Sequence, residues 1–250
     1  NTFLSKKKGR VAFIGGSITQ MNGYRPMIAA DLQKRFPEAK FQFVNAGISS
    51  TCSTTGAFRM QEHVLEGEPI DLFFVEFAVN DDQDAAHSTQ DCIRGLEGIL
   101  RQALESNPNM DIVVTHFVNT KMLNSFARGE TPLSIAAHER VVRHYGVSSI
   151  VLAKEISERI EDESMSWKVY GGVHPKPAGN RACADMIHSL LETAWQDGTS
   201  EIRAHPVPDD LLDRTSYVGG RMLPQNQANL IQGWQIKVPQ WKELTGGKRE

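Results

Sequence analysis

Short apolar runs alternate with longer amphipathic stretches from the start of the chain to about residue 195. The runs are rich in Val, Ile and Phe at consecutive positions, a pattern typical of strands that are covered on both faces of a parallel sheet. The predicted strands occupy 11–15, 41–46, 72–77, 112–117 and 149–152. The predicted helices occupy 24–36, 56–66, 89–105, 133–145, 153–162 and 177–195. This alternation predicts an α/β fold, a doubly wound three-layer α/β/α sandwich around a five-stranded, mostly parallel sheet.

The pattern changes after about residue 195, where Pro and Gly separate short segments such as 235–238 and the alternation of strand and helix stops. Such punctuation is typical of turns and loops. We therefore expect one domain over residues 1–195. Residues 196–250 are expected to form a tail of loops and short strands that either packs on the domain or begins an accessory β module.

Composition and charge narrow the classes of function. The chain has 250 residues, 40% of them hydrophobic and 23% charged, which is ordinary for a protein that folds around its own core. Lys and Arg number 27 against 30 Asp and Glu, and the resulting net charge of −3 offers no basic excess for a nucleic-acid backbone. No apolar run approaches the roughly 18 residues of a membrane span, and the first residues lack the apolar centre of an export signal. We expect a soluble protein without nucleic-acid or membrane partners; because the chain starts at Asn1 rather than Met, its compartment stays open.

Cofactor sites find little support in the sequence. Cys52, Cys92 and Cys183 are odd in number and lie at long, unrelated spacings, so we expect free thiols rather than disulfides or a zinc site. The acidic run 81–84 lacks the Gly and the distal Glu of a calcium-binding loop. The expectation is that the protein needs neither a metal nor an organic cofactor.

Four residues that follow predicted strands or precede the last helix carry the candidate chemistry, because ligands of an open parallel sheet gather at the carboxyl ends of its strands. Ser17 follows the first strand after two glycines, which permit a sharp turn that presents its hydroxyl and N–H to the crevice. Gly47 follows the second strand and Asn80 the third, and a bare N–H and an amide NH₂ are donors that suit an oxyanion hole. His174 lies in a loop that two prolines stiffen. Each block alone is also an ordinary turn, and the first lacks the spacing of a phosphate-binding loop.

Together and in this order, the four blocks resemble those of the SGNH hydrolases, the GDSL esterase/lipase superfamily, over about residues 9–195. The resemblance implies a flavodoxin-like sandwich and a role for each residue. Ser17 would be the nucleophile, and His174 its general base and later the acid to the leaving group. The N–H groups of Ser17 and Gly47 and the amide of Asn80 would hold the oxyanion. The residues of the first and third blocks are most similar to those of a bacterial branch of the superfamily that is associated with carbohydrate esters.

The sequence departs from the family pattern in three places. Gly16 stands where the first block usually has Asp, and Ala78 stands where the third block usually has Gly. The departure with the largest consequence is Gly171, three residues before His174, where the family has the Asp that orients the imidazole. Our preferred interpretation is that a backbone carbonyl accepts the hydrogen bond from Nδ1 of His174, as in Ser-His dyads. Candidate carboxylates that would replace the Asp are those of Asp81, Asp82 and Asp162.

Candidate substrate-binding side chains flank these blocks and the fourth strand; they are Tyr24, Arg25, His116, Asn119 and Trp167. Aromatic rings beside a shallow crevice suit a sugar, although core packing explains them equally well. We predict a serine esterase for small acyl groups, acetyl first, on a carbohydrate, acting through a Ser-His dyad or a non-standard triad. The alternatives are a lipase or thioesterase for longer acyl chains and a catalytically weak carbohydrate-binding relative.

Overall fold

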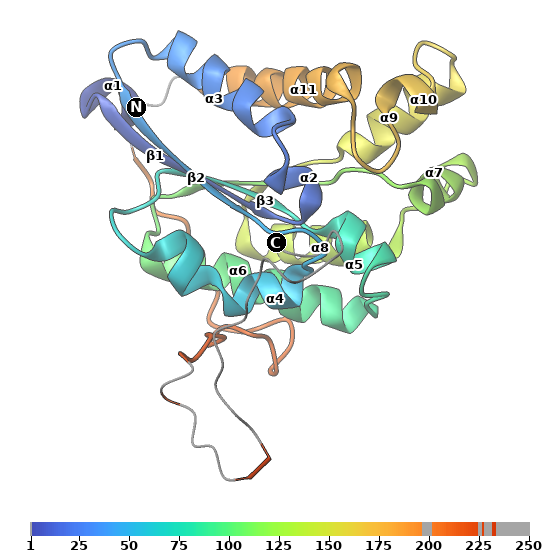
Figure 1. Cartoon of the computed structure of the whole chain (residues 1–250). Coiled ribbons are helices and arrows are strands. Elements are labelled where there is room, and N and C mark those ends of the chain that lie inside the picture. Colours follow the sequence, from blue (N-terminus) through green and yellow to red (C-terminus); the bar gives the residue numbers. More distant parts are fainter. Residues whose placement is uncertain (1, 197–201, 225–226, 228–231, 234–250) are drawn as a thin grey trace.

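A sheet of five parallel strands forms the centre of the structure, and helices cover both of its faces (Figure 1). The computed structural model describes residues 2–196, 202–224, 227, 232 and 233. The sheet order is β2-β1-β3-β4-β5, which confirms the predicted sandwich and makes every strand pair parallel. The strands are β1 (Lys8–Gly15), β2 (Lys40–Gly47), β3 (Leu72–Glu76), β4 (Asp111–Thr115) and β5 (Ser148–Ile150).

Two groups of helices form the outer layers (Figure 1). One face of the sheet packs against α3 (Tyr24–Arg35), α9 (Leu152–Glu161) and α11 (Pro177–Gln196). The other face packs against α4 (Ser53–Phe58), α6 (Thr89–Ser106) and α8 (Leu133–Tyr145). The shorter helical elements are α1 (Thr2–Ser5), α2 (Ser17–Gln20), the π-helical turn η1 (Gln61–Leu65), α5 (Ala78–Gln83), α7 (Thr120–Ala127) and α10 (Trp167–Tyr170).

Strand β1 shows why consecutive apolar residues predict a covered sheet. Val11 and Phe13 point into the core beneath α3 and α11, whereas Ala12 and Ile14 point into the core beneath α4 and α6. Because successive side chains of a strand face opposite sides, both faces need apolar residues. Strand β2 differs from this expectation: it lies at the edge of the sheet, and Ala46 is its one buried residue.

Element boundaries shift by a few residues from the predicted ones. The predicted strand 149–152 is too long, because β5 ends at Ile150 and α9 already begins at Leu152. The predicted helix 56–66 begins too late and is split into α4 and η1. Short helices such as α2 and α5 are missing from the prediction because a single turn has too few positions to show a 3.6-residue period.

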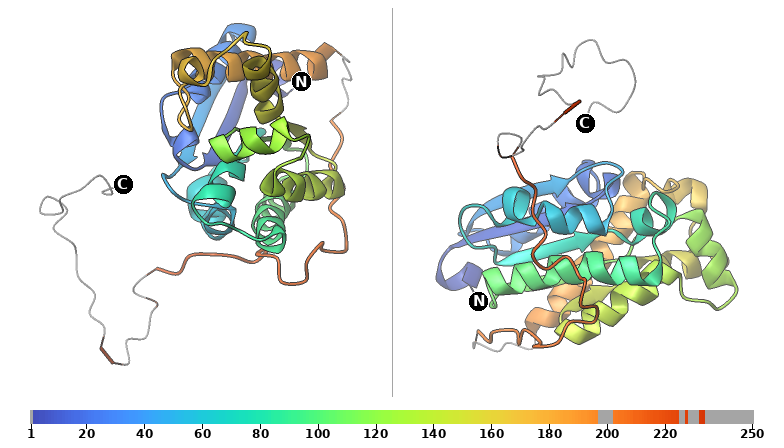
Figure 2. Two further views of the ribbon diagram at one scale, coloured as in Figure 1. Left: turned by 90° about the vertical axis from the view of Figure 1, so that its right-hand side faces the viewer. Right: turned by 90° about the horizontal axis from the view of Figure 1, so that it is seen from below.

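The described part of the tail, residues 202–224, contains no strand and runs as loops beside α6 and α8 (Figure 2). The buried Glu97 carboxylate of α6 anchors it by accepting hydrogen bonds from the backbone N–H groups of Leu212 at 2.8 Å and Asp213 at 3.1 Å. The Gln102 side chain of α6 donates to the carbonyl of Tyr217 at 3.1 Å. The segment 235–238, which suggested a strand, lies outside the described residues. Within the described part of the chain, none of the helices is long and apolar enough to cross a membrane.

The strand order places the candidate residues together. In a doubly wound sheet, ligands bind at the carboxyl edge where the direction of winding reverses, which is here the boundary between β1 and β3. Ser17 follows β1 and Asn80 follows β3, while Gly47 ends β2 on the other side of β1. The fold therefore brings three of the four blocks to one edge.

Candidate active site

The turn after β1 positions the candidate nucleophile. Gly15 ends the strand, Gly16 caps the start of α2, and Ser17 is the first residue of that helix. A side chain at Gly16 would overlap the amide of Asn80, so the absence of a Cβ permits the first and third blocks to touch. Oγ of Ser17 lies 2.8 Å from Nε2 of His174, within hydrogen-bond distance. This is the contact that a serine nucleophile and its general base need.

The loop that carries His174 explains the missing Asp of the family pattern. Gly171 ends α10 in the left-handed region at a φ of +117°, which favours Gly. A side chain there would also overlap the backbone nitrogen of Lys176. The amide of Asn180 holds the same loop by donating to the carbonyls of Pro175 and Lys176. The position therefore has no room for an acid in this backbone conformation.

Nδ1 of His174 faces no acid partner. Within residues 2–196 and the described tail, the one hydrogen bond of the His174 ring is that to Ser17. The three candidate carboxylates bond elsewhere: Asp81 to Ser53 and His138, Asp82 to Asn119 and Lys121, and Asp162 to Ser164. The backbone carbonyl that we preferred as acceptor is likewise absent from the described surroundings of the ring. The His174 residue itself is exposed.

The two candidate oxyanion donors besides Ser17 have partners within the chain. The N–H of Gly47 donates to Oδ1 of Asn45 at 3.1 Å. Nδ2 of Asn80 donates to Oδ2 of Asp84 at 2.6 Å, and Asn80 is buried. An amide NH₂ has two donors, so the bond to Asp84 fixes the orientation of the Asn80 amide and leaves its second N–H. A substrate oxyanion would have to displace the Asn45 oxygen from Gly47.

Glu76 is a functional candidate that the sequence analysis missed. It ends β3, is fully buried beneath the nucleophile turn, and accepts a hydrogen bond from Oγ1 of Thr19 at 3.3 Å and another from the backbone N–H of Gly16. Its second oxygen has no partner among the described atoms. Burial raises the pKa of Glu76 to about 8, so the carboxyl is mostly protonated at neutral pH. The signal in the sequence was an acidic residue inside the apolar run 72–77.

An open crevice of about 420 Å³ contains the Ser17–His174 pair. Its other walls are Gln20, Asn22 and Ser49, which are polar, and Met21, which is apolar and exposed. Five of its six lining residues are polar, which suits a small acyl group on a hydrophilic carrier.

The predicted substrate-binding residues lie away from this crevice. Tyr24 and His116 are fully buried and Asn119 is nearly so, which excludes direct contact with a substrate. Their polar atoms are used internally: Tyr24 bonds Thr19, His116 bonds Glu139, and Asn119 caps α7. Arg25 donates to the carbonyl of Thr19 and to the side chain of Asn22, so it supports a crevice wall from behind. The half-buried Trp167 ring stacks on Tyr170 with 5.3 Å between centroids.

A second polar cluster surrounds Asp81, the residue after Asn80. Its carboxylate accepts hydrogen bonds from the N–H of Ser53 at 2.8 Å and from the hydroxyl of Ser53 at 2.7 Å, and it lies 2.9 Å from Nε2 of His138. Nδ1 of His87 forms an ion pair with it at 3.4 Å. Burial alone would raise the pKa of Asp81, but hydrogen bonds from His138 and Ser53, together with the adjacent His87 ring, hold it well below its usual range. The carboxylate in turn raises the pKa of His87.

The fold and the contact between Ser17 and His174 agree with the resemblance stated from the sequence, and comparison with known families shows the class to which the chain belongs. The sequence profile of the GDSL-like lipase/acylhydrolase family matches residues 13–182, well over half of the chain. The chain therefore belongs to the GDSL-like lipase/acylhydrolase family, a class of carboxylic ester hydrolases. This confirms the resemblance to the SGNH superfamily. No curated protein matches the chain.

Solved structures with the same fold include esterases of acetylated polysaccharides. A two-domain esterase active on acetylated mannans is 26% identical with a TM-score of 0.69, and the match covers 83% of this chain and 54% of that one. The same enzyme co-crystallised with mannopentaose gives 24% identity and a TM-score of 0.68. The chain thus spans about half the length of that esterase. The acetyl xylan esterase Axe2 from Geobacillus stearothermophilus shares the fold at 19% identity and a TM-score of 0.55, with 79% of this chain and all of the other covered.

Proposed function

We propose that the chain hydrolyses small acyl esters, acetyl esters first, on a carbohydrate, with Ser17 as the nucleophile. The observation that carries this proposal is the 2.8 Å contact between Ser17 and His174 within a short, polar crevice. The family assignment and the acetyl-polysaccharide esterases among the structural neighbours support the same class of substrate.

The reaction follows from the positions of the donors and acceptors. Oγ of Ser17 attacks the ester carbonyl while Nε2 of His174 takes the hydroxyl proton. The negative charge of the tetrahedral intermediate is held by the N–H groups of Ser17 and Gly47 and by Nδ2 of Asn80. His174 returns its proton to the alcohol that leaves, and water then attacks the acyl-enzyme by the same sequence and releases the acid. Asn45 gives up its bond to Gly47 when the oxyanion arrives, which makes the hole a site that the substrate completes.

The missing acid sets the expected rate. In a Ser-His-Asp triad the acid fixes the imidazole tautomer and stabilises the imidazolium, and its loss costs about 10⁴ in kcat. Here the exposed His174 has no acid partner that would orient its ring, and solvent alone is left to stabilise the imidazolium. We therefore propose a Ser-His dyad with modest turnover.

A catalytically silent carbohydrate-binding protein is the second candidate. It is favoured by the same unpartnered Nδ1 and by the engagement of Gly47 and Asn80 with Asn45 and Asp84. A lipase or thioesterase is disfavoured, because a longer acyl chain needs apolar walls and the crevice supplies Met21 alone.

The test is hydrolysis of p-nitrophenyl acetate and octanoate, together with acetate release from acetylated mannan and xylan oligosaccharides. The proposal expects acetate to be the better acyl group by at least about tenfold, release of acetate from a polysaccharide, and loss of both activities in Ser17→Ala. A preference for octanoate would support the lipase. Absence of turnover on every ester, with retained binding of the oligosaccharides, would support the silent binder.

A further inference from the structure

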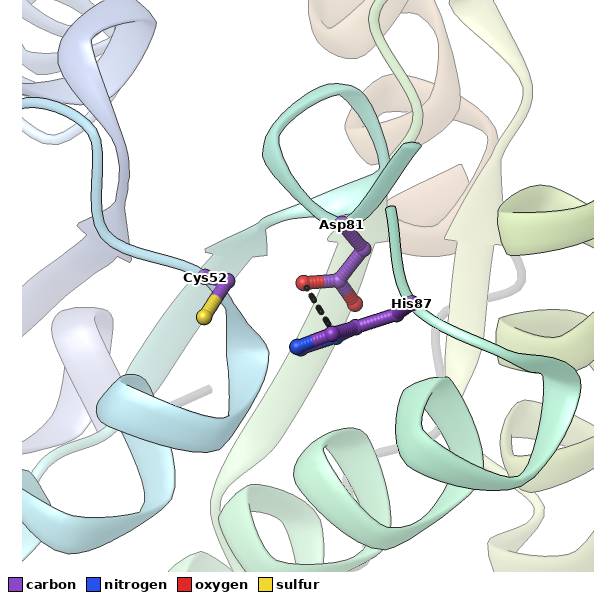
Figure 3. Close-up of side chains that lie close together, drawn as sticks. All are labelled: Cys52, Asp81 and His87. Atoms are coloured by element: carbon purple, nitrogen blue, oxygen red, sulfur yellow. Dashed lines mark ion pairs between the residues drawn. The ribbon is translucent and has the colours of Figure 1, made fainter. Parts of the chain in front are cut away.

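The side chains of Cys52, Asp81 and His87 lie close together (Figure 3). Cys52 caps the start of α4, Asp81 lies in α5, and His87 lies in the loop before α6. The cysteine sulfur, a carboxylate oxygen and a ring nitrogen all lie within 4.8 Å of one another. Three segments that are separate in the sequence therefore bring soft, hard and borderline ligand atoms to one point.

The hydrogen bonds of Asp81 leave one acceptor position facing His87. Oδ2 is occupied by the hydroxyl of Ser53 and by His138, while Oδ1 accepts the N–H of Ser53. Nδ1 of His87 is buried and lies 3.4 Å from Oδ1, yet it makes no hydrogen bond with acceptable geometry. The ring nitrogen and the carboxylate oxygen therefore face each other without a well-aligned hydrogen bond. A cation between them would satisfy both.

The spacing agrees with zinc coordination. Nitrogen and oxygen ligands about 2.0–2.1 Å from zinc, at a tetrahedral angle, lie about 3.3–3.4 Å apart. Nδ1 of His87 and Oδ1 of Asp81 already have this separation. The Cys52 sulfur lies within 4.8 Å of these two atoms. A rotation of this half-buried side chain that moves the sulfur by about 1 Å would bring it to the roughly 3.6 Å expected between a zinc-bound thiolate sulfur and the neighbouring ligand atoms.

The charges also fit. The Cys52 sulfur lies 3.0 Å from the hydroxyl of Thr54 and 3.7 Å from that of Thr55, and hydroxyl groups can donate to a thiolate. A thiolate and the Asp81 carboxylate together balance a divalent cation, with a neutral imidazole as the third ligand. Calcium and magnesium prefer oxygen ligands, so the thiolate selects a softer ion.

We propose that Cys52, Asp81 and His87 form a binding site for one divalent cation of the zinc class, with a fourth position open to water. On binding, the Cys52 thiol loses its proton to the buffer, as does His87 where its ring is protonated. The partly exposed side chains of Cys52 and His87 give the ion a path from solvent. The ion would join the segment after Gly47 to the segment that contains Asn80.

A neighbouring set, Asp81, Cys92 and His138, is less suited to an ion. All three residues are buried, and His138 already uses its Nε2 in a 2.9 Å contact with Asp81. Burial also raises the pKa of the Cys92 thiol, which opposes the thiolate that a metal needs. Since both sets share Asp81, one experiment separates them.

The test uses Co²⁺ as a spectroscopic probe for zinc in the purified full chain after treatment with a chelator. We expect one equivalent of Co²⁺ to produce the near-ultraviolet charge-transfer absorption of a thiolate–cobalt bond, and Zn²⁺ to abolish it by competition. Zn²⁺ at about 100 times its Kd should raise Tm by several degrees, because an ion that binds the folded state stabilises it. Neither readout depends on esterase activity, so the result is independent of the proposed function.

Variants decide the assignment. Cys52→Ser should remove the charge-transfer band while remaining folded, and His87→Gln should weaken Zn²⁺ binding by at least about tenfold. Cys183→Ser, which changes a buried thiol remote from the cluster, should leave both signals unchanged. The proposal is overturned if the unmodified protein gives no band and no Tm shift, if Cys52→Ser keeps the band, or if Cys92→Ala removes it while Cys52→Ser does not.

Discussion

The exposed Ser17–His174 pair and the buried cluster around Asp81 each include a residue that follows a strand at the carboxyl edge of the sheet, Ser17 after β1 and Asp81 after β3. The two sites nevertheless differ in which members of a catalytic triad they contain. His174 has a nucleophile and no acid. The other cluster has an acid, Asp81, and two histidines, His138 and His87, but its serine, Ser53, is buried and cannot meet a substrate. The parts of a triad are all present in this fold, but they are divided between two sites.

The difference teaches what each arrangement is suited for. A buried carboxylate that accepts three hydrogen bonds is held in place and does not meet a substrate, so it fixes α4, α5 and α8 relative to one another. A histidine with one partner and an exposed ring contributes little to stability but can take and return a proton. We therefore expect catalysis to depend on the first site and stability on the second.

Replacing the general base should have the largest effect. His174→Ala removes the group that takes the Ser17 proton, and we expect kcat/KM to fall by about 10⁴, with an unfolding free energy within about 0.5 kcal/mol of the unmodified protein. Initial rates on p-nitrophenyl acetate and urea unfolding measure the two quantities. The control is His188→Ala, which changes a partly exposed histidine of α11 and should leave the rate within twofold. A loss of less than tenfold in His174→Ala would remove His174 from the mechanism.

Removing the buried acid should reverse this balance. Asp81→Ala leaves Ser53, His87 and His138 without their shared acceptor, and we expect it to cost about 3–5 kcal/mol of unfolding free energy. The protein that remains folded should keep kcat within about tenfold. Asp82→Ala is the matched control, because this neighbouring carboxylate pairs with the exposed Lys121, and it should cost about 1 kcal/mol. Equal losses in the two variants would show that the Asp81 cluster has no special structural role. Chelator-treated protein keeps metal binding out of the comparison.

The sequence was sufficient for the sheet and for the four blocks, because each rests on a local pattern. Consecutive apolar residues predict a covered strand wherever the strand lies inside the sheet, as β1 and β3 do. The same reasoning failed for β2, since nothing within its own residues states that it lies at the edge. The contact between Ser17 and His174 joins positions 157 residues apart, and the sequence predicted it through the family resemblance rather than through spacing.

The surroundings of the blocks could not be predicted, because they depend on where side chains point. Tyr24 and His116 follow functional segments in the sequence but turn into the core, while Gln20 and Ser49, which have no distinctive motif, line the crevice. Cys52 and His87 are 35 positions apart, and only the packing of α4 against α6 shows that they share a site with Asp81. Glu76 is the exception, because an acidic residue inside the apolar run 72–77 is a local signal of a buried polar group.

The candidate active site also has a buried acid, Glu76, so its replacement tests how a second buried carboxyl group affects stability. The folded pKa of about 8 lies above the ordinary value of 4.5, so the folded protein holds a proton that the unfolded chain releases. The stability from this group is complete below pH 4.5 and is lost as the pH rises toward 8. Glu76→Gln should therefore lose less stability than the unmodified protein between pH 5 and 9, by on the order of 2–4 kcal/mol in unfolding free energy.

The measurement is guanidinium unfolding at pH 5, 7 and 9 for the two proteins. Glu62→Gln, an exposed change in η1, is the control and should follow the unmodified protein at every pH. Parallel curves for Glu76→Gln and the unmodified protein would mean that Glu76 is ionised throughout, and its carboxylate would then have to be counted as a charge beneath Ser17.

The smallest expected effect concerns Gly171, where the family has the Asp of the triad. If this position only lacked the acid, Gly171→Asp should raise kcat/KM. We expect Gly171→Asp to lower kcat/KM instead. The backbone there has a positive φ and no space beside Lys176, so any side chain displaces the loop that carries His174. We expect Gly171→Ala to cost about 2 kcal/mol of unfolding free energy and about tenfold in kcat/KM.

Gly172→Ala is the control that separates backbone strain from crowding against Lys176. Gly172 also has a positive φ but open space around it, so this variant should cost about 1 kcal/mol of unfolding free energy with little change in kcat/KM. Equal rates for the two alanine variants would mean that backbone strain, and not crowding against Lys176, governs the position of His174.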